Sequence, residues 1–169
     1  RTECHRSEAI MNSREKAMLH RGMDRVRQKR YEEAVAVFDQ LLAENDQLSD
    51  AWNNRGVALF ALGRLEEALD CYDRCLSIDP ENLDAMRNKA FLLRSSRRLE
   101  EALSLYDRVL EKGGDGYDLE AAAAVLTGLG RLEEALNCLM LAKNTLSLMR
   151  LEDEIALVKK LMERGGDET

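Results

Sequence analysis

The sequence predicts an all-α fold in which antiparallel helix pairs stack one after another as a solenoid. The string RLEEAL occurs at residues 64–69, 98–103 and 131–136, and a looser copy, RYEEAV, lies at 30–35. The shared alanine stands at positions 34, 68, 102 and 135, so the period is 34 or 33 residues, which is typical of a solenoid. One proline and 5% aromatic residues argue against an all-β sandwich.

Residues 51–82 show how each repeat forms two helices. The stretch DAWNNRGVALFAL contains good helix formers and has one apolar face. Gly63 should end this first helix, because glycine adopts a positive φ at little cost. The stretch RLEEALDCYDRCLSI also places apolar residues at helical spacing. Pro80 stops this second helix, because the residue before a proline disfavours the helical conformation.

Glycine and its replacements mark special positions in the repeat. Glycine inside a helix costs about 1 kcal/mol relative to alanine, so Gly22 and Gly56 indicate a close backbone approach between two helices. Ala90 fills the same slot in the third repeat. At two turns between paired helices, Lys29 and Arg97 replace glycine, which predicts non-glycine residues in a strained left-handed conformation.

The pattern of these residues resembles the tetratricopeptide repeat over most of the chain. The match is nearly complete in the second repeat, at Trp52, Gly56, Leu59, Gly63, Leu65, Ala68, Tyr72 and Pro80. The resemblance implies a right-handed αα superhelix, in which the first helix of each repeat lines a concave groove and the second lies on the convex face. It also implies that the groove binds an extended peptide or a partner helix.

We expect four repeats, at about residues 15–48, 49–82, 83–115 and 116–148, after an N-terminal extension of residues 1–14 that is loose or partly helical. An apolar stripe then predicts a capping helix over 149–164, continuing from about residue 147, because open-ended arrays must cover their last apolar face. The residues of this stripe are Leu148, Leu151, Ile155, Val158 and Met162. We expect a loose tail at 165–169. A flexible joint, if the array has one, belongs in the glycine-rich junction KGGDGYD.

In the first helix of each repeat, the position of a side chain relative to the small residue predicts whether that side chain faces the groove. The candidates for peptide binding are His20, Met23, Asn53, Asn54, Val57, Phe60, Arg87, Asn88, Phe91 and Arg94. The same count in the fourth repeat gives Glu120, Ala121, Ala124, Thr127 and Gly128.

These candidates suggest what the ligand looks like. Asn54 and Asn88 fall in equivalent slots, and a carboxamide can both donate to and accept from the main chain of a peptide. Arg87 and Arg94 add planar cations suited to carboxylates, while the apolar candidates form a floor. The pattern favours a short peptide with at least one acidic group. The alternative is that these are ordinary inward-facing side chains with no ligand.

Composition limits the other classes of function. A net charge of −7 gives the chain no basic footprint for nucleic acid, although the first helix carries Arg21, Arg25, Arg27 and Lys29. The longest uncharged runs, such as VALFALG, are far shorter than the roughly 20 apolar residues of a membrane span. We see no signal-peptide pattern, and the four cysteines match no disulfide or zinc spacing. We therefore expect reduced thiols, a cytoplasmic location and no membrane partner.

No catalytic, cofactor or metal site is expected. The sequence has two histidines and no glycine-rich phosphate loop. Cys71 and Cys75 lie one helical turn apart, and we interpret them as packing residues. The paired glutamates that recur with the repeat indicate electrostatics at helix starts, not a catalytic dyad.

The sequence therefore predicts a non-enzymatic scaffold for protein–protein interaction that binds a protein or peptide ligand in the concave groove. The alternative is a structural module that self-associates as a homo-oligomer, through the edges of the solenoid or its convex face. The exposed first helix and the last helix, rich in Met and Leu, motivate that alternative.

Overall fold

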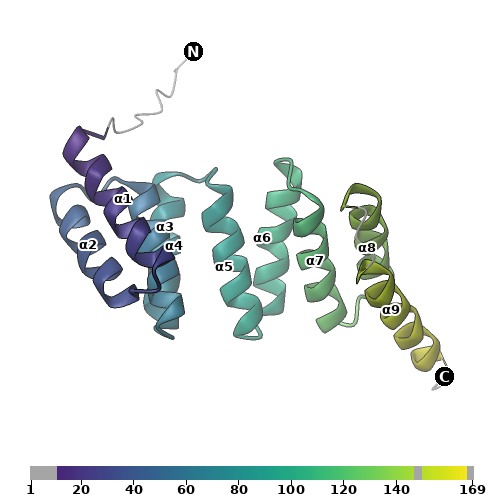
Figure 1. Cartoon of the computed structure of the whole chain (residues 1–169). Helices are drawn as coiled ribbons and strands as arrows, with labels where there is room; N and C mark the ends of the chain where they lie inside the picture. The colour runs from purple at the N-terminus through teal and green to yellow at the C-terminus, as the bar shows by residue number, and fades with distance from the viewer. Residues whose placement is uncertain (1–10, 147–149, 167–169) are drawn as a thin grey trace, which may run out of the picture. The chain divides into compact units, whose positions relative to one another are not determined.

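The computed structural model describes residues 11–146 and 150–166, and within this part of the chain every regular element is an α-helix (Figure 1). The chain divides into two compact units. The N-terminal unit ends at Ala85, and the C-terminal unit begins at Met86.

The N-terminal unit consists of two helix pairs. They are α1 (Ser13–Arg27) with α2 (Tyr31–Glu44) and α3 (Ser49–Ala61) with α4 (Leu65–Ile78). The helices of each pair pack against each other, and α3 also packs against α1 and α2. Buried apolar side chains from all four helices therefore form one continuous core.

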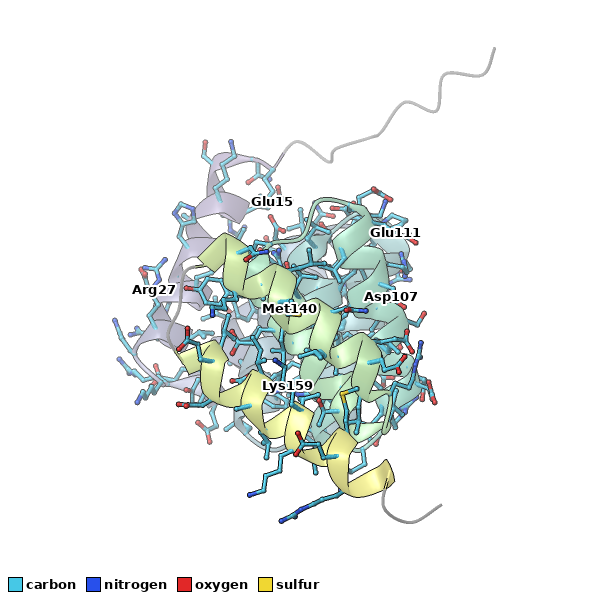
Figure 2. The ribbon with its side chains drawn as sticks, turned by 90° about the vertical axis from the view of Figure 1, so that its right-hand side faces the viewer. Glu15, Arg27, Asp107, Glu111, Met140 and Lys159 are labelled. Atoms are coloured by element: carbon cyan, nitrogen blue, oxygen red, sulfur yellow. The ribbon has the colours of Figure 1, made fainter. Side chains whose placement is uncertain are left out.

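The C-terminal unit contains most of α5 (Leu83–Ser95) and four further helices. These are α6 (Leu99–Glu111), α7 (Gly116–Gly128), α8 (Leu132–Leu146) and α9 (Arg150–Gly166). From α6 onward, each helix packs against the next one along the chain. Figure 2 shows α8 and α9 from the C-terminal side.

Two glycines let helices of a pair approach closely. A Cβ atom added at Gly56 would lie 2.6 Å from Cε1 of Tyr72, and one added at Gly22 would meet the ring of Phe38. The close approach expected from these glycines is confirmed, but the neighbour is an aromatic ring of the second helix and not its backbone. Glycine is needed in these two slots because the ring occupies the space of a side chain.

The turns between paired helices use the left-handed conformation. Gly63 and Gly130 have φ of 76° and 75°, while Lys29 and Arg97 have φ of 59° and 62°. The strained geometry predicted for the two non-glycine turns is confirmed. Each such residue costs about 1–2 kcal/mol, which the packing of the helix pair must offset.

The RLEE string, which occurs three times, places an arginine–glutamate ion pair at the start of α4, α6 and α8. Arg64 donates from Nε and Nη2 to the two carboxylate oxygens of Glu67, over 2.7 and 2.6 Å. The pairs Arg98–Glu101 and Arg131–Glu134 repeat this geometry. The hydrogen bond from Arg64 lowers the pKa of Glu67. The recurring glutamates thus belong to helix starts, as the sequence indicated.

The side chain of Trp52 binds to the loop that connects α2 and α3. Its indole Nε1 donates to the backbone oxygen of Asp46 over 2.9 Å. Cζ of Arg55 lies over the indole ring, 5.9 Å from its centroid. Trp52 is the single tryptophan of the chain and is half-buried, so it reports on the N-terminal unit.

The ends of the helical region differ slightly from the expected boundaries. Asn12 caps α1 through a hydrogen bond from the backbone of Glu15, so helix formation begins within the expected N-terminal extension. At the other end, α9 continues to Gly166, two residues into the expected tail. Leu151 and Val158 of the predicted stripe are buried. Leu148, Cys4 and the remaining residues of 1–10, 147–149 and 167–169 lie outside the described part.

Candidate functional site

The candidates in the N-terminal unit lie on α1 and α3, which pack against each other. They differ in exposure, because His20 is exposed, Asn53 is buried, and the others are half-buried. The half-buried candidates are Met23, Asn54, Val57 and Phe60. Asn54 donates from Nδ2 to the backbone oxygen of Asp50 over 2.8 Å. One donor of its carboxamide is therefore already used within its own helix.

In the C-terminal unit, the candidates on α5 separate into two groups. Asn88 is half-buried, and Arg87 points to α7, where Nε and Nη2 donate to Oδ1 and Oδ2 of Asp118 over 2.8 and 2.7 Å. A guanidinium held at two points by an internal carboxylate is a poor receptor for a second one, because its charge is already matched. We therefore leave Arg87 out of the proposed site.

Asp118 is the centre of this arrangement. It is 4% exposed, and it accepts a further hydrogen bond from the backbone N–H of Asp115 over 2.9 Å. Burial alone would raise the pKa of Asp118, but the hydrogen bonds from Arg87 and Asp115 outweigh burial and hold that pKa below its usual value. A Cβ atom at Gly114 would lie 2.9 Å from Oδ2 of Asp118. The glycine-rich junction is thus shaped around a buried carboxylate.

Phe91 and Arg94 form the second group on α5. The side chain of Phe91 is 44% exposed, which is high for an aromatic residue. Cζ of Arg94 lies 5.1 Å from the centroid of the Phe91 ring, within the range of a cation–π contact. The two side chains therefore present a combined apolar and cationic edge.

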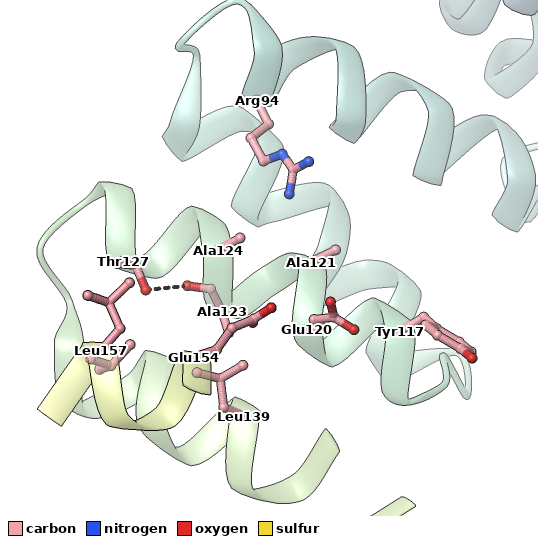
Figure 3. A pocket seen from close by; sticks show the side chains of 11 residues that line it. Arg94, Tyr117, Glu120, Ala121, Ala123, Ala124, Thr127, Leu139, Glu154 and Leu157 are labelled. Atoms are coloured by element: carbon pink, nitrogen blue, oxygen red, sulfur yellow. Dashed lines mark hydrogen bonds between the residues drawn. The ribbon is translucent and has the colours of Figure 1, made fainter. Parts of the chain in front are cut away.

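Arg94 also lines a pocket of about 550 Å³ that lies within the C-terminal unit (Figure 3). The pocket is built from α5, α7, α8 and α9. Its lining residues are Arg94, Tyr117, Glu120, Ala121, Ala123, Ala124, Thr127, Leu139, Glu154, Leu157 and Val158.

The floor of the pocket is apolar and almost free of long side chains. On α7, alanines at 121, 123 and 124 line the pocket with small side chains, so a ligand could approach this helix closely. Thr127 donates its hydroxyl to the backbone oxygen of Ala123 over 2.9 Å, as Figure 3 shows, so its donor is used within α7. Tyr117 and Leu157 are each 56% exposed. The pocket thus combines a smooth floor with exposed apolar side chains.

The repeat pattern of the chain matches a known family. Family models described as tetratricopeptide repeat match residues 16–47, 49–82 and 82–113, which together make up more than half of the chain. The chain belongs to the tetratricopeptide repeat family. No curated protein matches it in sequence.

Solved tetratricopeptide structures are similar to this chain. MamA 41-end from Desulfovibrio magneticus RS-1 has a TM-score of 0.83 at 17% identity, and the match covers 90% of this chain and 88% of that one. MamA AMB-1 has a TM-score of 0.77 at 19% identity, with 92% and 93% covered. TTC0263, a thermophilic TPR protein in Thermus thermophilus, has a TM-score of 0.71 at 17% identity, with 85% and 80% covered. At these identities the likeness shows the fold alone, and it confirms the predicted all-α tetratricopeptide fold class.

Some of the residues that line this pocket were named from the sequence. The groove count in the fourth repeat named Glu120, Ala121, Ala124 and Thr127, and all of these line the pocket. Of the ten candidates for peptide binding, Arg94 lines it. The contribution of α9 was missed because this helix was interpreted only as a cap. The sequence contained one indication of a further role for this helix, because Leu157 is apolar but lies outside the predicted apolar stripe.

The described residues also show how the thiols are placed. Cys71 and Cys75 are buried and free, and burial raises the pKa of Cys75 to about 12. Within residues 11–146 and 150–166, no group of three or more His, Cys, Asp or Glu side chains is placed to hold a metal ion. In the same part of the chain, no helix has the length and apolar character needed to cross a bilayer.

Proposed function

We propose that this tetratricopeptide protein is a non-enzymatic scaffold that binds a segment of a partner protein on the surface formed by α5, α7 and α9. The family points to an interaction scaffold. The observation that supports this particular site is the pocket of about 550 Å³ with its alanine floor. Its volume falls within the range of roughly 300–1,000 Å³ that is usual for ligand sites.

The exposed side chains around the pocket suit a peptide segment. Phe91, Tyr117 and Leu157 remain exposed to 44%, 56% and 56%, so binding would remove apolar surface from water. The alanines on α7 would let the backbone of the segment lie close to the helix. The candidates on α1 and α3 of the N-terminal unit, and separately Asn88 on α5, remain predictions for peptide binding.

The test is selection of short random peptides on the purified chain, followed by affinity measurement with pocket variants. Ala124→Trp fills the floor of the pocket and should weaken the selected peptides by tenfold or more, on the order of the loss of one buried side-chain contact. The matched control is Ala36→Trp on the exposed surface of α2, which should leave the affinity unchanged.

Circular dichroism must show that both variants remain helical, and Leu157→Glu provides a second way to block the pocket. The proposal fails if no peptide is enriched, or if Ala124→Trp and Leu157→Glu both bind the selected peptides as tightly as the wild type does.

Self-association is a second candidate function, and a separate observation supports it. Met140 and Leu141 on α8 are 51% and 56% exposed, and Figure 2 shows Met140 on the surface of that helix. Sedimentation velocity over a dilution series would test this function. We expect an oligomer that dissociates on dilution and that is lost in Met140→Lys/Leu141→Lys. A wild-type chain that stays monomeric at high concentration would rule it out.

A further inference from the structure

The first helix of the N-terminal unit differs in charge from the rest of that unit. Residues 11–30, which include α1 and the turn after it, contain seven Lys or Arg residues and two Asp or Glu residues. Residues 31–85, which include α2, α3 and α4, contain three basic and thirteen acidic residues. The N-terminal unit therefore has a basic first helix and an acidic remainder.

Four of the seven basic residues already have a carboxylate partner within the fold. These ion pairs are Arg14–Glu44, Arg25–Glu33, Arg27–Asp24 and Arg30–Glu33, with N–O distances between 2.6 and 3.5 Å. The other three are Lys16, Arg21 and Lys29, whose exposed side chains form no ion pair or hydrogen bond within residues 11–146 and 150–166. The described part of the fold therefore leaves three positive charges unmatched.

Two of these three cations lie on one exposed face of α1. We use the name α1 face for Lys16, Ala17, His20 and Arg21, all of which are exposed. Residues four positions apart are neighbours on a helix, so Lys16 adjoins His20, and Ala17 adjoins Arg21. The imidazole of His20 can also donate a hydrogen bond to a carboxylate. Three side chains therefore offer donors within about 7.5 Å along the helix axis.

Both acidic residues of α1 are already engaged within the fold. Glu15 is 8% exposed, and its carboxylate accepts two hydrogen bonds. Asp24 is bound to Arg27. Helix stability does not explain Lys16 either, because it lies at the end of the first turn of α1, where the helix macrodipole disfavours a cation. The α1 face is therefore suited to a negatively charged partner.

The surroundings of the α1 face favour protein over other negatively charged partners. A nucleic acid would extend beyond α1 and meet the acidic remainder of the unit, which repels phosphates. No residue of α1 is aromatic, so a base would find no ring on which to stack. The α1 face also has no large apolar side chain that could insert into an anionic bilayer. A short acidic segment of a protein can fit on α1 alone.

We propose that the α1 face binds an acidic segment of a partner protein, with Lys16 and Arg21 contacting its Asp or Glu carboxylates. The unequal charge within the N-terminal unit would steer such a segment toward α1. The pocket is built in the C-terminal unit, so this site does not depend on the function proposed above.

The probes for the test are a peptide of about a dozen residues in which Glu alternates with Gly and Ser, and a copy with Gln in place of Glu. At low salt the purified chain should bind the Glu peptide about tenfold more tightly than the Gln copy. Added salt should weaken this binding, because screening reduces the attraction between the charges.

Charge-reversal variants test whether the α1 face is the site. Lys16→Glu/Arg21→Glu should weaken binding of the Glu peptide by about tenfold or more, because like charges then meet. Lys159→Glu/Lys160→Glu makes the same change in net charge at exposed positions of α9, and this control should alter the affinity by less than about threefold. Ala124→Trp, which fills the pocket, should leave the affinity unchanged.

Several outcomes would overturn the inference. One is equal binding of the Glu peptide and its Gln copy, and another is equal weakening by the two double variants, since net charge alone would then account for binding. Tighter binding of a single-stranded RNA of the same charge, or of vesicles containing phosphatidylserine, would assign the face to another partner class. A wild-type oligomer that dissociates in Lys16→Glu/Arg21→Glu would assign it to a second copy. Circular dichroism checks folding, and Lys16→Gln/Arg21→Gln replaces the charge-reversal variant if that one does not fold.

Discussion

Arg87 and Asp118 form a two-point ion pair that joins α5 to α7, with Nε–Oδ1 and Nη2–Oδ2 distances of 2.8 and 2.7 Å. The same carboxylate accepts from the backbone N–H of Asp115 and so helps to begin α7. One buried side chain therefore serves both the start of a helix and its attachment to a neighbouring helix. Arg87, which the sequence suggested as a ligand-binding residue, instead holds two helices of the fold together.

We predict that Asp118→Ala lowers the free energy of unfolding by about 2–3 kcal/mol. Breaking a buried pair leaves the other charge unmatched, but Arg87 is 34% exposed, so water would compensate in part. Urea unfolding followed by far-UV circular dichroism would measure the change. Glu44→Ala, which removes an exposed pair with Arg14, is the control and should cost less than about 1 kcal/mol. Equal losses in the two variants would contradict the structural role of Asp118.

The stabilisation by Asp118 should depend on pH in a defined direction. Its pKa in the folded chain lies below the usual value of about 3.9 for the unfolded chain. The stabilisation is therefore complete above about pH 4 and is lost as the pH falls through the folded pKa. We expect the difference in unfolding free energy between the wild type and Asp118→Asn to be constant near neutral pH and to shrink toward about pH 3. A difference that grows on acidification would show that the sign is wrong.

The close contact between α3 and α4 predicts that Gly56 does not tolerate a side chain. Gly56→Val should lower the free energy of unfolding by about 3 kcal/mol or more, because its added atoms would overlap the buried Tyr72 ring. Ala61→Val places the same side chain at an exposed position of α3 and should cost about 0.5 kcal/mol. Thermal unfolding of the two variants, compared with the wild type, would test this. Similar melting temperatures for both would argue against a tight contact.

The thiols should differ in reactivity. Burial raises the pKa of Cys71, although Arg55 donates to its sulfur over 3.0 Å, and burial raises the pKa of Cys75 to about 12. Cys138 is only half-buried. Because the thiolate is the reactive form, we expect iodoacetamide at mildly alkaline pH to label Cys138 well before Cys71 or Cys75. Mass spectrometry of the digested chain would show the order, and equally fast labelling of Cys75 would contradict its burial.

Much of the fold followed from the sequence because its causes are local. The period of the RLEEAL string located the helix pairs, and Lys29 and Arg97 marked the turns where a positive φ is required. Gly56 indicated a close contact. Its partner, Tyr72, lies 16 positions away on the other helix of the pair. Both residues of this contact therefore belong to the same repeat.

The site was harder to predict because it depends on contacts between repeats. Arg87 and Asp118 are 31 positions apart, and the helical spacing of one does not reveal the direction of the other. The count from the small residues named Glu120 and Ala124, and both line the pocket. It could not show that α9 turns Leu157 toward the same pocket, because that helix lies outside the repeat and has no counterpart for comparison.

The single tryptophan has a practical consequence for the study of this chain. The hydrogen bond from Trp52 to Asp46 and the contact with Arg55 lie wholly in the N-terminal unit. Indole fluorescence therefore follows that unit selectively, whereas far-UV circular dichroism follows the helices of both. If the two signals change at different denaturant concentrations, the units unfold separately, and the emission spectrum identifies which one is the less stable. The native sequence thus contains a spectroscopic label for one half of the molecule.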